Sequence, residues 1–185
     1  MEQPTNINWS FEEVRNIGCN ACSLCSYSPP NKVCLTGQGP RDAEWMFVGE
    51  APGAREQELE RPFSGPVGRY FDLTLSNVGI DRGEVYITNA CKCKPLHDDK
   101  PTSTQVAACK HYLLREIYLV RPKKILIIGD TALIAVVGKS KISSYRGKVL
   151  TIKIEGLDYS VEIYPIFHPG YIRRNPRFYP MLYTD

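Results

Sequence analysis

Four of the seven cysteines have the spacing expected for ligands of one metal site. Cys19 and Cys22 form a Cys-x-x-Cys pair, and Cys93 and Cys109 form a second pair that is more widely spaced. Four thiolates suit either zinc or an iron–sulfur cluster, and their spacing alone does not choose between the two. Zinc modules more often use two close pairs, whereas prolines interrupt the second pair of this chain. The pattern therefore favours a cluster, with zinc as the alternative.

The other three cysteines, Cys25, Cys34 and Cys91, are interpreted as structural or idle thiols. One alternative is open, because Cys22 and Cys25 also form a Cys-x-x-Cys pair in which Cys25 would replace Cys19. A disulfide framework is not expected, since the number of cysteines is odd and the N-terminus is too polar for a signal peptide. The sequence also has no apolar run long enough to span a membrane. We therefore expect a soluble, cytoplasmic protein.

The elements that must position these cysteines alternate between helix and strand. Periodicity and apolar runs predict helices at 1–18, 66–78, 103–120 and 131–137, and strands at 44–48, 85–88, 123–129, 148–154 and 159–167. This alternation predicts an α/β fold, a three-layer α/β/α sandwich with a central, mainly parallel four-stranded sheet. In such folds ligands bind at the carboxyl ends of the strands. The segment between Cys19 and Pro40 has no sustained period and is predicted to be a loop held by the metal site.

Length and charge set further limits on the chain. With 185 residues, 43% of them hydrophobic, we expect a single domain over 1–185, with an N-terminal helix and cluster loop at 1–40 and an α/β core at 41–185. The formal net charge of +3 permits binding to nucleic acid without requiring it.

Several short motifs occur in a particular order along the chain. They are the spaced cysteines, GEAPG at Gly49 to Gly53, RPFSG at Arg61 to Gly65, TNACKCKP, and HPGYIRRNP. In this order the motifs resemble those of the family 4 uracil-DNA glycosylases, over a match that runs from Cys19 to Pro176. The resemblance implies the fold, the excision of uracil from DNA, and a structural [4Fe-4S] cluster on Cys19, Cys22, Cys93 and Cys109.

The resemblance also assigns substrate-binding residues. A glycosylase extrudes its target nucleotide from the duplex, at a cost recovered by stacking and hydrogen bonds in a fitted pocket. By resemblance, Phe63 offers a flat face to the flipped base, Asn89 pairs with the amide edge of uracil, and Glu56 excludes the methyl group of thymine. Gly49 and Ala51 belong to the same pocket. Without the motifs these side chains would be interpreted as a core phenylalanine, a strand-end asparagine and a solvated glutamate.

Cleavage of the glycosidic bond leaves an anionic uracil and an electron-poor sugar. Catalysis therefore needs charge stabilisation on the base and a water at the sugar. The resemblance gives the first task to His168, whose neutral ring donates an N–H to the uracil oxyanion and which also contacts the base; a purely structural histidine is the alternative. Some related families carry an aspartate where this chain has Ala51. We expect Glu50 to position the water, with backbone groups as the alternative, and we count Glu50, Asn89 and His168 as catalytic.

The segment after His168 resembles the family's intercalation loop. Ile172 is the candidate wedge that fills the space of the flipped base. Arg173, Arg174, Lys92 and Lys94 are candidate phosphate contacts, for which solvated surface side chains are the alternative. We expect a monomer that acts on single- or double-stranded uracil-containing DNA and does not associate with a membrane.

Three features depart from the family's pattern. Glu60 stands where a glycine is common, Arg173 replaces an apolar residue, and the chain ends at Asp185 where the family usually continues into a final helix. We expect that helix to be missing, either by truncation or because the chain is one domain of a longer protein. Two other functions stay open: an inactive uracil-DNA or single-strand DNA-binding module of the same fold, and a zinc-stabilised interaction domain.

Overall fold

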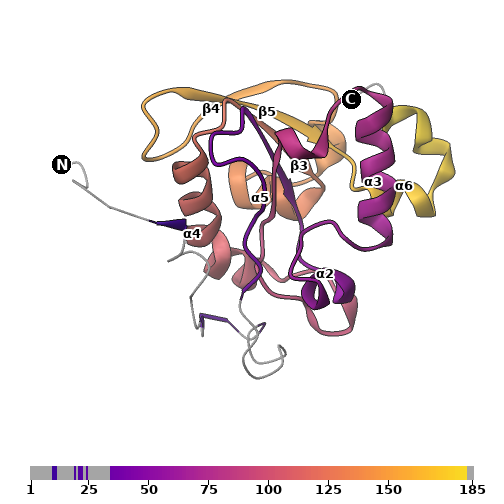
Figure 1. Cartoon of the computed structure of the whole chain (residues 1–185), viewed down its shortest axis with the longest axis horizontal. Coiled ribbons are helices and arrows are strands. Elements are labelled where there is room, and N and C mark those ends of the chain that lie inside the picture. Colours follow the sequence, from indigo (N-terminus) through magenta and orange to yellow (C-terminus); the bar gives the residue numbers. More distant parts are fainter. Residues whose placement is uncertain (1–9, 12–18, 20, 23, 25–33, 183–185) are drawn as a thin grey trace.

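The computed structural model describes residues 10–11, 19, 21–22, 24 and 34–182 (Figure 1). The helix expected at 1–18 falls almost entirely outside these residues, and so does Cys25. Every structural statement below concerns the described residues.

A five-stranded sheet forms the centre of the molecule, in the order β2-β1-β3-β5-β4 (Figure 1). The strands are β1 (Trp45–Gly49), β2 (Tyr86–Asn89), β3 (Lys124–Ile128), β4 (Leu150–Lys153) and β5 (Ser160–Ile166). β1 pairs in parallel with β2 and β3, and β3 pairs in parallel with β5. The predicted α/β class and mainly parallel sheet are confirmed.

The predicted strand number of four is corrected to five. β4 pairs antiparallel with β5 at the edge of the sheet, with Leu150 opposite Ile163 and Lys153 opposite Ser160. The chain between them turns at Gly156, whose φ of 88° lies in the left-handed region that favours glycine. This hairpin adds an edge strand to the four parallel ones, because a tight turn can join only antiparallel strands.

Helices cover both faces of the sheet and make three layers. On one face α3 (Pro66–Asn77) packs Phe71 and Leu75 against Phe47 of β1. On the other face α4 (Ser103–Val120) and α5 (Asp130–Val137) pack against Met46 and Val48. Alternate residues of β1 therefore enter opposite layers, which explains why its sequence is apolar throughout.

Local sequence explains where the long helices begin and end. α3 starts at Pro66, a residue favoured at the first helical position. Thr102 caps α4 by accepting a hydrogen bond from the backbone N–H of Gln105, whose side chain bonds back to Thr102. α5 ends at Gly138, which has a φ of 72°. The predicted helices at 66–78, 103–120 and 131–137 are confirmed to within one residue.

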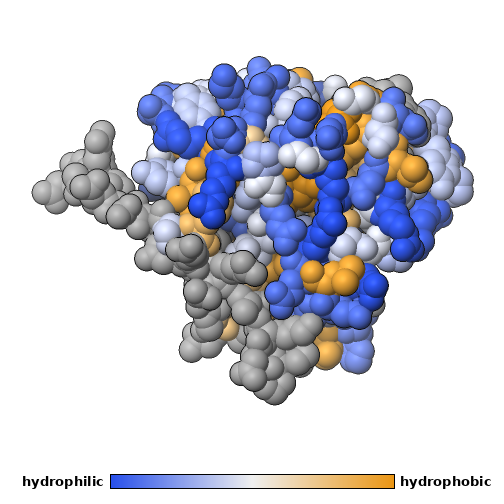
Figure 2. All heavy atoms as spheres, viewed as in Figure 1, coloured by the Kyte–Doolittle hydropathy of each residue, from blue (hydrophilic) through white to orange (hydrophobic). Residues whose placement is uncertain are grey.

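The remaining helical segments are short, and the sequence did not predict them. They are α2 (Ala54–Glu58), α6 (Pro169–Arg174), and the 3-10 turns η2 (Arg82–Glu84), η3 (Leu96–Asp98), η4 (Ile142–Ser144) and η5 (Pro176–Leu182). Among the described residues, no helix is both long and apolar enough to cross a membrane. The face shown in Figure 2 is largely hydrophilic, with hydrophobic side chains in several separate areas.

Candidate active site and cysteine cluster

The carboxyl ends of β1 and β2 bring Gly49 and Asn89 side by side. The two residues are register partners in the parallel pair. A Cβ atom on Gly49 would lie 2.4 Å from Asn89 Oδ1 and 2.6 Å from Phe63 Cζ, so only glycine fits between the amide and the ring. Three residues that the sequence assigned to substrate binding therefore meet at one point, at the sheet edge where ligands of α/β folds bind.

Phe63 is held in an unusual backbone conformation. Its φ is 51°, and its buried ring packs on Phe71 with 5.2 Å between the ring centroids. Gly68 of α3 lies directly beneath it, because a Cβ atom there would come within 1.8 Å of the Phe63 carbonyl oxygen. The Arg82 guanidinium donates to the carbonyl groups of Phe63, at 3.2 Å, and Pro62, at 2.6 Å. Sequence reasoning missed Arg82, which lies outside every motif.

The side chain of Asn89 is buried but available to a ligand. Within the described residues, its amide makes no hydrogen bond, while its backbone carbonyl accepts one from Lys92. A buried amide normally has a partner. Asn89 can therefore offer one donor and one acceptor to a bound molecule beside Phe63.

Glu56 joins the two loops that lie beside Gly49 and Asn89. Its carboxylate accepts hydrogen bonds from the backbone N–H groups of Gly53, in the GEAPG loop, and Phe63, in the RPFSG loop. Burial raises the pKa of Glu56, although these hydrogen bonds oppose the shift. The interpretation as a solvated surface glutamate does not fit this environment.

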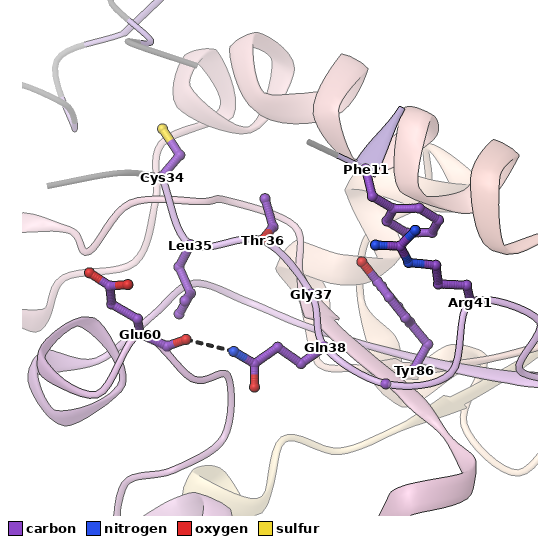
Figure 3. Close-up of a pocket in the computed structure, with 10 residues that line it drawn as sticks. Phe11, Cys34, Leu35, Thr36, Gly37, Gln38, Arg41, Glu60 and Tyr86 are labelled. Atoms are coloured by element: carbon purple, nitrogen blue, oxygen red, sulfur yellow. Dashed lines mark hydrogen bonds between the residues drawn. The ribbon is translucent and has the colours of Figure 1, made fainter. Parts of the chain in front are cut away.

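Glu60 explains one departure from the family's pattern. Its φ of 49° lies in the region that favours glycine, the residue expected here from the resemblance. The amide of Gln38 donates to its carbonyl at 2.8 Å and so holds the turn (Figure 3). In this chain a glutamate therefore adopts the left-handed backbone conformation at this position.

His168 follows β5 and caps the N-terminus of α6. Its Nδ1 accepts a hydrogen bond from the backbone N–H of Gly170 at 3.1 Å, so in the neutral ring the proton is on Nε2. Burial lowers the pKa of His168, and Arg174 and Lys100 act in the same direction, while Glu50 opposes them. The neutral ring is therefore favoured at neutral pH, and it presents an N–H donor.

Glu50 lies close enough to His168 to influence its pKa. Its Oε2 accepts a hydrogen bond from the Thr131 hydroxyl at the start of α5, at 2.6 Å. This contact fixes one carboxylate oxygen and joins the ends of β1 and β3. Thr131 is a second residue that sequence reasoning missed, since its only signal was its place just after a strand.

Two DNA-contact expectations are corrected by burial. Ile172 is 1% exposed, whereas a wedge must project from the protein surface, so Ile172 is a core residue of α6. On the same helix Tyr171 is 38% exposed, and Arg173 and Arg174 are exposed. Lys92 is buried and its ammonium forms an ion pair with Glu116, so it does not contact phosphates. Lys94 is half-buried, and its Nζ bonds the Pro95 carbonyl at 3.0 Å.

The predicted ligand cysteines come together in space. Cys109 forms hydrogen bonds with Cys91 and Cys22, and Cys34 bonds Cys93 and Cys19. The sulfur atoms of Cys34 and Cys93 are 3.4 Å apart. Cys34 and Cys91, interpreted above as idle thiols, are therefore packed into the same cluster as Cys19, Cys22, Cys93 and Cys109.

Contacts among these thiols shift their pKa values in opposite directions. The hydrogen bond from Cys93 lowers the pKa of Cys34 to about 7, and the one from Cys91 lowers the pKa of Cys109 to about 6. The pKa values of Cys91 and Cys93 are raised by the same bonds and by burial. Among the described residues, no group of three or more His, Cys, Asp or Glu side chains has an arrangement that could already hold a metal ion. The donor set, a group of largely buried thiols in mutual contact, fits zinc or an iron–sulfur cluster.

A hollow of about 350 Å³ lies beside this cluster, at the outer edge of β2 (Figure 3). Cys34, Arg41 and Tyr86 line it, together with Phe11, over whose ring the Arg41 guanidinium lies at 4.7 Å. None of the predicted catalytic residues lines this hollow. The hollow is separate from the group of side chains around Gly49 and Asn89.

Fold and site together define an α/β protein with a group of polar and aromatic side chains at the carboxyl ends of its parallel strands and a thiol cluster nearby. Residues 36–183 match the family model of the uracil DNA glycosylase superfamily. A type-4 uracil-DNA glycosylase of Pyrobaculum aerophilum is 36% identical over 170 residues, which cover 89% of this chain and 83% of the relative.

Two further type-4 uracil-DNA glycosylases are similar. The protein of Thermotoga maritima is 36% identical over 83% of this chain and 79% of its own length. That of Saccharolobus solfataricus is 32% identical over 97% of this chain and 83% of its own length. The chain therefore belongs to the type-4 family of the uracil-DNA glycosylase superfamily, as its motifs predicted.

Proposed function

We propose that this protein hydrolyses the N-glycosidic bond of uracil in DNA and leaves an abasic site, as a monofunctional glycosylase in base excision repair. The names of its relatives support this activity. One structural observation carries the proposal: the amide of Asn89, which has no hydrogen-bond partner among the described residues, lies across Gly49 from the Phe63 ring. His168 lies at the same end of the sheet.

Recognition follows from the chemistry of this pocket. Uracil extruded from DNA stacks on the ring of Phe63 and pairs its amide edge with Asn89. Cytosine presents a different donor and acceptor pattern, so the same amide discriminates against it. Glu56 keeps the two pocket loops together and restricts the space beside the base, where thymine carries its methyl group.

Bond cleavage needs a donor for the negative charge that develops on the base. Neutral His168 supplies the Nε2–H, because its Nδ1 is occupied by the Gly170 N–H. Such a donor stabilises the departing uracil anion in a site from which water is largely excluded. Its lowered pKa keeps it neutral, so no proton transfer is required before the bond breaks.

Glu50 positions the attacking water in this proposal. Thr131 holds one carboxylate oxygen, and the other accepts a hydrogen bond from the water in this proposal. Replacement of Glu50 by Gln in correctly folded protein is expected to slow single-turnover cleavage. Full activity of Glu50→Gln would instead assign the water to backbone groups.

Phosphate contacts are assigned to the exposed end of α6. Arg173 and Arg174 project from this helix, directly after the segment that carries His168. Contacts of this kind position DNA without reading its sequence, on either single- or double-stranded substrate. We assign the activity to a monomer.

The cysteine cluster is assigned a structural [4Fe-4S] cluster, with Cys19, Cys22, Cys93 and Cys109 as its ligands. A bound cluster would tie the segment around Cys19 to α4 and to the loop after β2. Iron and sulfide analysis tests this assignment directly, and equimolar zinc without iron would overturn it.

Cleavage of a uracil-containing oligonucleotide, followed by alkali, tests the proposed activity. Wild type is expected to give strand scission, while Asn89→Ala and His168→Ala are expected to be strongly impaired. Equal activity in all three proteins would refute the assigned site. Binding of the oligonucleotide by wild type without scission would instead indicate the DNA-binding module.

A further inference from the structure

A buried ion pair lies between the cysteine cluster and the base pocket. Lys92 and Glu116 are 1% and 0% exposed, and Lys92 Nζ lies 2.6 Å from Glu116 Oε2. Neither side chain has a part in the proposed reaction. Burial of two charges is costly, and such pairs often contribute little net stability. The buried pair is therefore better explained by a role in positioning neighbouring groups than by a contribution to stability.

The ammonium group of Lys92 reaches the strand that carries Asn89. Besides Glu116, it donates to the Thr88 hydroxyl at 2.7 Å and to the Asn89 carbonyl at 2.8 Å. An ammonium group has three protons, and these three bonds use them all. Thr88 in turn donates to Glu116 Oε2 at 2.6 Å, and the backbone N–H of Gly37 donates to Oε1 at 2.8 Å. Every proton of the ammonium group and of the Thr88 hydroxyl is thus used.

The main chain of Lys92 lies within the cysteine cluster. Cys91 and Cys93 flank it, and its backbone N–H bonds the sulfur of Cys109. Cys109 and Glu116 both lie on the buried side of α4. One residue therefore contacts the cluster through its backbone and the base pocket through its side chain.

We propose that Lys92 is a positioning residue that holds Asn89 in the orientation needed to bind uracil, and that Glu116 and Thr88 support it. This inference rests on the proposed function. The bond to the Asn89 carbonyl fixes the end of β2, from which the amide projects beside Gly49 and Phe63. Because the amide makes no bond of its own within the described residues, its orientation depends on the backbone and on packing.

The first test removes both charges together, so that neither remains unpaired. In Lys92→Met/Glu116→Gln we expect the single-turnover excision rate to fall about 10- to 100-fold, the effect of a misplacement of up to about 1 Å. Inhibition by free uracil should weaken by at least about 10-fold, because uracil alone probes the base pocket. Affinity for DNA without uracil should not change. The exposed pair Lys124→Met/Glu44→Gln, 2.8 Å apart at the other end of the sheet, is the matched control.

The second test keeps the charged pair and changes only Thr88. Thr88→Val removes the hydroxyl that bonds both partners while preserving shape, and Thr88→Ser retains it. We expect Thr88→Val to lose excision rate and uracil inhibition together, and Thr88→Ser to restore both. This comparison decides the question if the double variant fails to fold.

Several outcomes would overturn the inference. One is wild-type excision and wild-type uracil inhibition, per folded molecule, in the double variant or in Thr88→Val. Another is a loss confined to the melting temperature, because that would assign the network to stability alone. If wild type itself does not excise uracil, the proposed function fails first and this inference falls with it.

Discussion

Substitution of Gly49 by alanine gives the sharpest test of the pocket. The added Cβ atom would lie 2.4 Å from Asn89 Oδ1 and 2.6 Å from Phe63 Cζ. Unbonded heavy atoms rest at about 3.5–4.0 Å, so the ring and the amide must each move by about 1 Å. Both groups belong to the proposed base site, and neither can retreat freely, because Phe63 packs on Phe71 and Asn89 ends a buried strand.

The expected cost has two parts. Overpacking of this kind lowers the free energy of unfolding by about 1–3 kcal/mol. Displacement of recognition groups by about 1 Å lowers the single-turnover excision rate by about 100-fold. That rate loss corresponds to about 2.7 kcal/mol of transition-state stabilisation. Affinity for DNA without uracil should be unchanged, since the exposed arginines of α6 are not disturbed.

The assay uses a uracil-containing oligonucleotide with enzyme in excess, and melting of the protein is followed in parallel. Gly83→Ala is the control, because a Cβ atom there would meet its nearest neighbour, Asp81 Oδ1, at an ordinary 3.4 Å. If folded Gly49→Ala excised uracil at the wild-type rate, Phe63 and Asn89 would not form the base site as described.

Three further predictions concern pH, metal and DNA. Burial lowers the pKa of His168 from 6.5, so neutral His168 persists at neutral pH, and excision should fall only below pH 6.5; a fall that begins above neutral pH would contradict this. Cys109→Ser should lose bound iron and its visible absorbance, whereas Cys34→Ser should retain both; equal retention would remove Cys109 from the ligand set. Arg173→Ala and Arg174→Ala should each weaken DNA binding and reduce the slope of log affinity against log salt by about 1; an unchanged slope would place both side chains away from phosphates.

The long elements could be predicted because their signals are local. The cap at Thr102 and the apolar spacing along 103–120 identify α4, and the continuous apolar run at 125–128 identifies a strand covered on both faces. The antiparallel pairing of β4 at the edge of the sheet could not be predicted from such local signals. A strand's own sequence does not reveal which neighbour it will pair with.

The general position of the site followed from the fold class. Carboxyl ends of parallel strands meet at one edge of the sheet, so Gly49, Asn89 and His168 could be expected there. The site at this edge also includes Thr131 and Arg82, which lie outside every motif. They contact Glu50 and Phe63 from segments distant in the sequence.

Residue types and motif order determined, without any coordinates, the family, the α/β class, and the cysteines to be brought together. Tertiary structure alone decided which side chains are buried. Lys92 and Ile172 have the sequence context of surface groups, yet each is enclosed by elements far away along the chain. Cys34 joins the thiol cluster for the same reason, because it lies beside Cys93 although 59 residues separate the two in the sequence. Periodicity reports only which side of its own helix or strand a residue faces. Burial, and with it the pairing of charges and the availability of a donor, depends on what packs against that side.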